Sequence, residues 1–380
     1  MTMRALTYDV VIVGAGIVGA ACADEFARRG MRVAVVDREG ISSGATGAAM
    51  GHIVVMDDSE AQFALTRYSQ QLWRKLRSEL PDDVEYEQCG TIWVAADDEE
   101  MDEVRRKHHY YGSRGVPTTV LDSQALRQLE PNLRPGLTGG LLVPEDVVLY
   151  PPCAARFLIE RAQHRGTDLR FGCSVASIGD GHVRLADGSD IPARIIVNAA
   201  GPRSPELTPE LQIKKRKGHL AITDRHPGFA HHQLVELGYL KSAHVVASDS
   251  VAFNIQPRRN GQVVIGSSRQ YGAEDTGVDS PILFRMLERA QEYMPQLKQM
   301  SLVRSWCGFR AATPDKLPLI GPWPDDKTLF IATGHEGLGI TTSLATARIL
   351  ADQVEGKSTE IPVEPYWPSR MVTENVSGGH

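Results

Sequence analysis

The chain has 380 residues, of which 42% are hydrophobic and 23% charged, and these near-average values exclude collagen-like, disordered and supercharged proteins. The length predicts two or three domains, or one large α/β unit with an insertion. The net charge of −6 argues against a nucleic-acid partner, because proteins that neutralise phosphate backbones are normally basic. The 35 glycines exceed the usual share of about 7%, and they fall in clusters.

The first forty residues have a strand, glycine loop, helix and strand in succession. Residues 8–13 (YDVVIV) are a β-branched run typical of a buried strand. Residues 21–30 have helical spacing, with Gly30 as the C-terminal cap, and residues 32–37 form a second strand that ends at Asp37. We therefore expect a βαβ unit with parallel strands and a right-handed crossover.

Helices and strands continue to alternate up to about residue 200, after a segment of small residues over 42–53. The patterns predict helices over 60–79 and 97–115, a short helix within 122–133 that stops at Pro131, and a helix from residue 151. They also predict a strand over 89–97 and strands over 168–201 with hairpin turns at Asp180-Gly181 and Asp187-Gly188.

Residues 211–310 are richer in strand-like runs, with one amphipathic helix over 281–294. The basic run KKRKG (214–218) is interpreted as a solvated turn, with partner docking as the alternative. Residues 328–354 return to strand, glycine loop and helix, so we expect two interleaved domains. The tail after Pro362 is expected to add little to the core.

Cysteine usage and targeting signals favour a cytoplasmic protein. The five cysteines are scattered, without a CxxC pair or zinc-ligand spacing, so we expect reduced thiols and no metal site. The N-terminus lacks a signal-peptide pattern, and no apolar run reaches the roughly 20 residues of a membrane span. Peripheral membrane association stays open.

The glycine loop after the first strand is a dinucleotide fingerprint. Gly14, Gly16 and Gly19 form G-x-G-x-x-G between a predicted strand and helix, and Asp37 ends the next strand. The glycines permit a tight turn, close approach to a pyrophosphate, and close helix–strand packing, and the helix N-terminus attracts phosphate. Asp37 would accept hydrogen bonds from the ribose hydroxyls.

Three later segments favour a tightly held FAD over an exchangeable NAD. They are a strand ending in Ala-Ala-Gly (195–201), a proline-pinned turn (313–322), and a glycine loop that leads into a helix (332–351). Gly334, Gly337 and Gly339 precede that helix. Its N-terminal dipole would stabilise the negative charge of a reduced flavin.

These motifs, in this order, resemble the D-amino-acid-oxidase-like family of FAD-dependent oxidoreductases, which includes glycine oxidase, sarcosine oxidase and D-hydroxyproline dehydrogenase. The resemblance spans about residues 5–355 and includes SSGATGAAMGHI and GFRAATPDKLPLIGP. It implies an α/β fold with a Rossmann-like FAD-binding domain (1–85, 145–210 and 311–365) and a substrate-binding domain on a mixed, largely antiparallel β-sheet (86–144 and 211–310), followed by a tail (366–380).

The resemblance also implies noncovalent FAD, because Gly308, beside Cys307, occupies the place of the flavin-linked cysteine of some members. The residues expected at the cofactor are Gly14, Ala15, Gly16, Ile17, Val18, Gly19, Asp37, Arg38, Ser43, Gly44, Ala45, Thr46, Gly51, His52, Val175, Ala200, Gly201, Gly334, His335, Gly337, Leu338, Gly339 and Ile340.

Arg310 is the expected anchor for a substrate carboxylate, because its planar fork binds carboxylates in a bidentate manner and its place before Thr-Pro-Asp resembles that of the family's anchor. His52, Tyr239 and Tyr271 are further candidates at the substrate. His335 and Glu336 are expected near the flavin ring or at the helix cap.

The expected activity is oxidation of the Cα–N bond of a small amino or imino acid by hydride transfer to flavin N5, with a D-hydroxyproline-like or D-proline-like substrate favoured over sarcosine, glycine or a D-amino acid. Oxygen, a quinone or a partner subunit would accept the electrons, and a homo- or hetero-oligomer is possible. The alternatives are a flavin subunit of a multi-subunit dehydrogenase complex and an NAD-dependent dehydrogenase.

Overall fold

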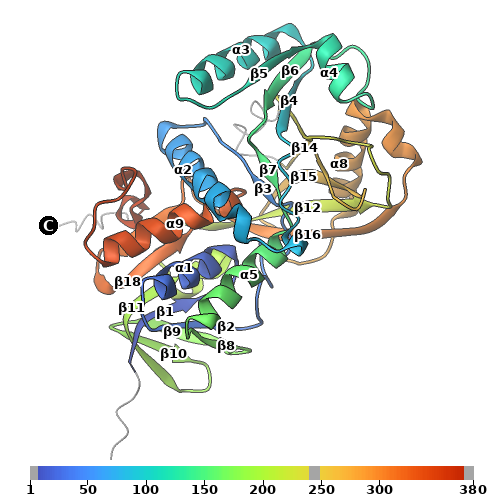
Figure 1. Cartoon of the computed structure of the whole chain (residues 1–380). Helices are drawn as coiled ribbons and strands as arrows, with labels where there is room; N and C mark the ends of the chain where they lie inside the picture. Colours follow the sequence, from blue (N-terminus) through green and yellow to red (C-terminus); the bar gives the residue numbers. More distant parts are fainter. Residues whose placement is uncertain (1–6, 239–248, 372–380) are drawn as a thin grey trace, which may run out of the picture.

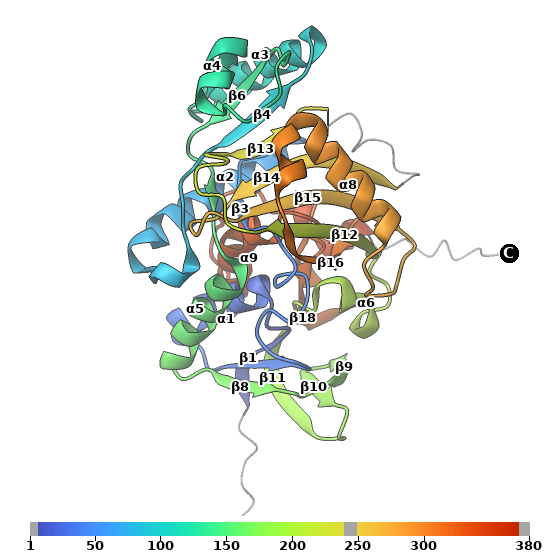
Figure 2. The ribbon, with the colours of Figure 1, turned by 90° about the vertical axis from the view of Figure 1, so that its right-hand side faces the viewer.

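A computed structural model describes residues 7–238 and 249–371 of the chain (Figure 1). Two large β-sheets dominate it, one below the other in Figure 2, and helices pack around both. The chain passes between the sheets more than once, because the second sheet takes strands both from the first half of the chain and from residues 214–312. This interleaved α/β architecture confirms the predicted fold class.

The first sheet is mostly parallel, with strand order β17-β18-β11-β1-β2-β8. Val10 of β1 lies opposite Val33 of β2 in a parallel pair, as the predicted crossover requires. The strands are β1 (Tyr8–Val13), β2 (Val33–Asp37), β8 (Asp168–Phe171), β11 (Asp190–Asn198), β17 (Leu319–Trp323) and β18 (Asp326–Thr333), with β9 (Val175–Gly179) and β10 (His182–Leu185) attached to β11. Asp180 and Gly181 both have positive φ in the predicted hairpin turn.

Successive residues of β1 and β2 face opposite sides, so both faces of this sheet are covered. On one side Val10 and Ile12 join a core with α1 (Ile17–Arg28), α5 (Pro151–His164) and α9 (Gly339–Val354), and α2 (Glu60–Leu76) packs on α9. Helix α1 begins four residues before the predicted start, because the glycine loop leads straight into it. Gly30 follows with φ +80°, the C-terminal cap that the sequence predicts.

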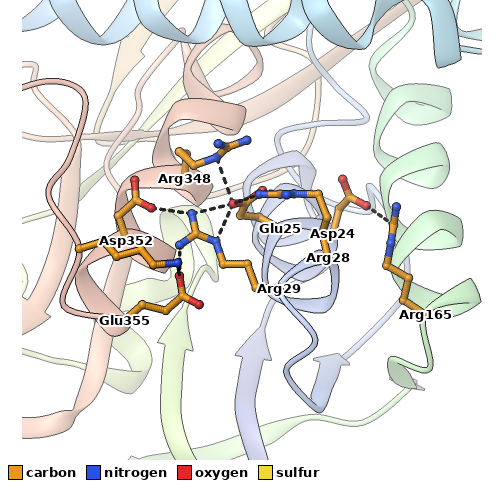
Figure 3. Close-up of polar contacts among 9 residues, drawn as sticks. Asp24, Glu25, Arg28, Arg29, Arg165, Arg348, Asp352 and Glu355 are labelled. Carbon is orange, nitrogen blue, oxygen red and sulfur yellow. Dashed lines mark hydrogen bonds and ion pairs between the residues drawn. The ribbon is translucent and has the colours of Figure 1, made fainter.

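An ionic cluster joins α1 to α9 (Figure 3). The Arg29 guanidinium lies 2.8 Å from Glu25 Oε1 and 2.6 Å from Asp352 Oδ1, and it also contacts Glu355. The side chain of Arg29 is only 8% exposed, so these three carboxylates compensate the charge that burial would otherwise leave unpaired. The cluster thereby holds together the two helices whose N-termini meet the cavity described below.

The second sheet is mixed and largely antiparallel, with order β16-β12-β15-β14-β13-β4-β6-β5. One face packs on α8 (Ser280–Tyr293), where Phe253 and Tyr293 stack with ring centroids 4.4 Å apart, and the other face looks toward the first domain. The strands are β4 (Thr91–Ala95), β5 (Thr119–Asp122), β6 (Gly139–Val143), β12 (Lys214–Thr223), β13 (Gln233–Glu236), β14 (Ser250–Pro257), β15 (Val263–Tyr271) and β16 (Leu302–Ala312).

Within residues 7–238 and 249–371, every helix is too short or too polar to cross a bilayer. Further elements connect the two large sheets and the helices packed on them. The connecting elements are β3 (His52–Ile53), β7 (Val147–Val148), α3 (Asp98–Gly112), α4 (Ser123–Leu129), α6 (Ser204–Leu207), η1 (Arg77–Glu79), η2 (Asp82–Val84), η3 (Gly201–Arg203), η4 (Pro295–Gln299), η5 (Glu364–Tyr366) and η6 (Pro368–Met371).

Two expectations are wrong. The basic run 214–218 is not a solvated turn but the first half of β12, between β16 and β15, and its Lys217 side chain is 1% exposed and pairs with Asp275. The chain after Pro362 also contributes to the core, since Tyr366 is fully buried and donates a hydrogen bond to Ala61 O. Strands β5, β6 and β7 escaped prediction because they are short, and β6 begins with two glycines.

Asp146, just before β7, is a buried carboxyl that makes stability depend on pH. Its Oδ1 accepts hydrogen bonds from Val55 N at 3.3 Å and Gln70 Nε2 at 3.0 Å, and burial raises its pKa from 3.8 to about 7. The folded state therefore favours the protonated carboxyl. Its contribution to the free energy of unfolding is fully present below about pH 4 and is lost as the pH rises to about 7.

Between pH 5.5 and pH 8.5, we expect ionisation of Asp146 to cost the wild type about 2 kcal/mol of unfolding free energy, since one unit of pKa difference is worth about 1.4 kcal/mol. Asp146→Asn stays neutral, so its stability relative to the wild type should rise by that amount across this range. Melting temperatures of both proteins across this range measure the effect. Parallel pH profiles in the two proteins would contradict it.

Candidate active site

A cavity of about 480 Å³ lies between the two sheets. Its lining combines the loops after the carboxyl ends of β1, β2, β11 and β18 with one face of the second sheet. In open α/β sheets, ligands normally bind at this carboxyl edge. Of the residues expected at a cofactor, all line the cavity except Ala15, Gly19 and Gly51. The latter two glycines serve packing, because a Cβ there would overlap Gly14 O or Leu149 O.

The glycine loop between β1 and α1 forms one end of the cavity. Gly14 has φ +113°, and a Cβ at this position would overlap Ala199 O and lie 2.9 Å from Ala199 C at the end of β11. Thr46 Oγ1 accepts a hydrogen bond from Ile17 N at 2.9 Å and so fixes the small-residue loop against the start of α1. The first turn of α1 thus presents its N–H groups and helix dipole to the cavity, where a pyrophosphate fits.

Asp37 is held rigidly beside this loop. Its Oδ2 accepts a hydrogen bond from Ala15 N at 2.8 Å, and its Oδ1 accepts from Glu39 N at 2.8 Å and Gly40 N at 2.9 Å. The carboxylate lines the cavity with its position set by backbone groups, which suits recognition of ribose hydroxyls.

The loop before α9 forms the opposite wall. Gly334 has φ +79°, and a Cβ there would lie 2.7 Å from Thr313 Cγ2, so only glycine fits. Glu336 forms an ion pair with Arg216 of β12 and ties this loop to the second sheet. His335 Nε2 lies 3.0 Å from Thr346 Oγ1, and burial lowers the His335 pKa to about 3, so this histidine is neutral and braces α9.

Together these features fit FAD. The start of α1 would hold the phosphates and Asp37 a ribose, and the small-residue ends of β11 and β18 would leave room for a flat ring. His52 supplies an independent observation, because its Nδ1 is buried without a protein partner in the wall of the cavity. Its Nε2 lies 3.2 Å from Gly337 O, which assigns the proton to Nε2 and leaves Nδ1 as an acceptor. Burial lowers the His52 pKa to about 4, so the ring is neutral at pH 7.

Arg310 projects from β16 across the floor of the cavity. Its Nη1 donates to Ser268 O on β15 at 2.9 Å, so the side chain passes over the intervening strand β12. It can do so because Gly218 of β12 has no side chain, and a Cβ there would lie 2.7 Å from Arg310 Cζ. On the other side, a Cβ on Gly337 would lie 3.9 Å from Arg310 Nε. The guanidinium therefore lies between the second sheet and the glycine loop of the first domain.

The remaining substrate candidates are placed differently. Tyr271 is 37% exposed at the end of β15 and does not line the cavity, and Tyr239 lies outside the described residues. Neither tyrosine is therefore placed at the substrate by the structure. On β12, His219 was not among these candidates, and it is buried outside the cavity lining: its Nδ1 lies 2.9 Å from Ser268 Oγ, and its Nε2 accepts a hydrogen bond from Asp279 N at 3.0 Å.

Cys307 does not line the cavity, whereas Gly308 does. The Cys307 thiol donates to Thr276 O at 3.2 Å, and burial raises its pKa. A Cβ at position 308 would overlap Ala48 Cβ, so β16 has no room for a flavin-linked cysteine there. Among the described ranges, no group of His, Cys, Asp or Glu side chains could hold a metal ion.

Sequence reasoning missed the polar face of the second sheet. Outside β16, the additional residues that line the cavity from this sheet are Thr91, Trp93, Arg216, Gly218, Leu220, Gln233, Val235, Asn254, Ser267 and Arg269. They occupy five strands that are far apart in the chain, and each lies where the alternation of its strand directs it. The alternation could be recognised within each strand from the sequence. Which face of each strand meets the cavity could not be predicted, because it depends on how the strands pair.

Gly218 provides a test of how Arg310 is positioned. We expect Gly218→Ala to push the guanidinium off the floor and to lower kcat/KM by roughly 100-fold, because small misplacements of an anchoring group are costly. FAD content should stay at one per chain. Gly112→Ala is the control, since Gly112 at the end of α3 also lacks a positive φ and a Cβ there would meet nothing within 4 Å. A Gly218→Ala enzyme with unchanged kinetics would contradict the assignment.

Comparison with known proteins agrees with this geometry. The sequence pattern of the DAO family, described as FAD dependent oxidoreductase, matches residues 9–353. The chain is 30% identical to glycine oxidase of Geobacillus kaustophilus over 96% of this chain and 97% of that protein, and the crystal structure of that enzyme superposes with a TM-score of 0.86, covering 96% and 99% of the two chains. It is 27% identical to hydrogen cyanide synthase subunit HcnC of Pseudomonas aeruginosa, over 97% of each chain. The chain therefore belongs to the DAO family of FAD-dependent oxidoreductases, as its glycine loops and the ordered motifs between them predict.

Proposed function

We propose that this protein oxidises the Cα–N bond of a small amino or imino acid, with a D-hydroxyproline-like or D-proline-like substrate favoured over glycine and sarcosine. The observation that carries the proposal is the position of Arg310, a guanidinium held across the floor of the cavity beside the glycine loop before α9. When bound, FAD supplies the acceptor for the hydride that leaves the substrate.

The chain's own residues bind and orient the substrate. Arg310 binds the α-carboxylate through its planar fork, which fixes the direction of the neighbouring Cα–H bond. His52 is neutral and offers Nδ1 as an acceptor for an N–H group, and Gly337 O fixes its tautomer. Because the lone pair of a neutral amine assists departure of the hydride, the site needs to orient the substrate more than it needs a strong general base.

Anaerobic mixing with a substrate panel tests the proposal. The panel contains D-proline, cis-4-hydroxy-D-proline, sarcosine, glycine and D-alanine, and the readout is loss of the flavin absorbance near 450 nm. We expect bleaching with the imino acids. An enzyme that no member of the panel bleaches would overturn the proposal.

A flavin subunit of a larger complex is the second candidate, favoured by the similarity to a protein named as a hydrogen cyanide synthase subunit. The same assays separate the two, because an oxidase forms peroxide when air is admitted, whereas a complex subunit passes electrons only to a dye or a partner.

A further inference from the structure

The second sheet carries a patch of buried polar side-chain atoms that have no hydrogen-bond partner in the protein and are not used by the roles above. Trp93 Nε1, Gln233 Oε1 and Asn254 Oδ1 are all buried atoms without a hydrogen bond, and all three residues line the cavity. Trp93 and Gln233 are each 3% exposed. An unpaired buried polar group costs about 1–3 kcal/mol, so three of them in one patch indicate a ligand that pairs them.

Strand register gathers these atoms on neighbouring strands. Val235 of β13 lies opposite Asn254 of β14 on one side and Trp93 of β4 on the other, so the three form one row across the sheet. Gln233 lies two residues before Val235 and therefore faces the same side. The row has two amide groups and an indole N–H and no ionised side chain.

The patch lies within reach of the carboxylate anchor. Arg310 donates to Ser268 O on β15, and Asn254 pairs with Gly266, two residues before Ser268 on the same strand. One strand spacing and two residues along a strand place Asn254 roughly 8 Å from that carbonyl. A single small substrate can span this distance.

Building on the proposed function, we propose that the substrate carries a second polar group, a neutral hydroxyl, which the Trp93–Gln233–Asn254 patch recognises. A hydroxyl matches the atoms present, because it accepts a hydrogen bond from Trp93 Nε1 while it donates one to an amide oxygen of Asn254 or Gln233. A carboxylate has no proton to donate to the two unpaired amide oxygens, and an alkyl group would leave all three atoms unpaired. The patch therefore selects a hydroxylated amino or imino acid over its unhydroxylated analogue.

The test compares pairs of substrates that differ by one hydroxyl: cis-4-hydroxy-D-proline with D-proline, trans-4-hydroxy-L-proline with L-proline, and D-serine with D-alanine. We expect the wild-type holoenzyme to prefer the hydroxylated member of at least one pair by tenfold or more in kcat/KM, because sites built to bind a hydroxyl reject analogues that lack it. Asn254→Leu and Trp93→Phe should each reduce this ratio at least fivefold, and Tyr271→Phe, at the exposed end of β15 and outside the cavity lining, should leave it unchanged.

The outcomes separate this inference from the function on which it rests. If the enzyme oxidises the unhydroxylated member of every pair equally well or better, or if Asn254→Leu and Trp93→Phe keep the wild-type ratio, the patch does not recognise a hydroxyl. If the two variants instead lose FAD or shift the flavin spectrum, the patch contacts the cofactor, which also overturns the inference. If no substrate in any panel is oxidised, the proposed function fails first, and this inference falls with it.

Discussion

Arg310→Ala is expected to lower kcat/KM for the best amino-acid or imino-acid substrate by roughly 10²- to 10³-fold. Removing one partner of a desolvated charge pair costs about 2–5 kcal/mol, and the substrate carboxylate would face an apolar stub in place of a guanidinium. Most of the loss should appear in KM, with a smaller loss in kcat from poorer alignment of the Cα–H bond.

Arg310→Lys is the matched comparison. It keeps the charge but loses the planar fork and the reach to Ser268 O, so we expect an intermediate loss of roughly tenfold. Both variants should retain FAD and the flavin absorbance of the wild type, because the pyrophosphate and ribose features lie at α1 and Asp37. Wild-type turnover by Arg310→Ala would show that another group binds the carboxylate, and the Arg310 assignment would then be wrong.

The dinucleotide half of the site was predictable because its chemistry is local in sequence. Gly14, Gly16 and Asp37 lie within one βαβ unit, so strand, loop and helix spacing alone brings them together, and the structure places all three in the cavity wall. The loop at 334–339 was predictable for the same reason, since its glycines stand directly before a helix.

Of the substrate candidates predicted from the sequence, two line the cavity: His52 and, on β16, Arg310. Its path depends on Gly218, and the two are neighbours because β12 and β16 pair with Gly218 opposite Gly308, a register between segments 90 residues apart. The basic run was misread for a related reason. A sequence of Lys and Arg indicates a solvated turn unless a partner such as Asp275 or Glu336 compensates each buried charge, and those partners come from distant segments.

Specific contacts join the second sheet to the loops of the first sheet around the cavity. Arg216 of the second sheet pairs with Glu336 of the loop before α9, and Trp306 Nε1 of β16 donates to Ala48 O of the small-residue segment at 3.2 Å. The loops that line the cavity therefore also fix the position of the second sheet relative to the cofactor-binding surface. A change in the cofactor loop should consequently affect substrate orientation as well as FAD affinity.

Gly14→Ala is expected to abolish FAD retention, so that the protein is purified colourless or aggregated. The new Cβ would overlap Ala199 O at the end of β11, and φ +113° is a conformation that side chains rarely adopt. Relief requires β11 and the β1–α1 loop to separate, which removes the surface on which the pyrophosphate rests. Backbone strain alone costs about 1–3 kcal/mol, and the overlap with a fixed backbone carbonyl adds to it.

Gly30→Ala is the control that separates backbone strain at positive φ from the overlap of a new Cβ with neighbouring atoms. Gly30 also has positive φ, at +80°, but a Cβ there meets nothing within 4 Å. We expect this variant to lose about 1 kcal/mol of stability and to keep one FAD per chain, as measured by the ratio of absorbance at 450 nm to that at 280 nm. If Gly14→Ala retained FAD as well as Gly30→Ala does, the close approach of the loop to β11 would not be what holds the cofactor. Asp37 and the loop before α9 would then be the features that retain it.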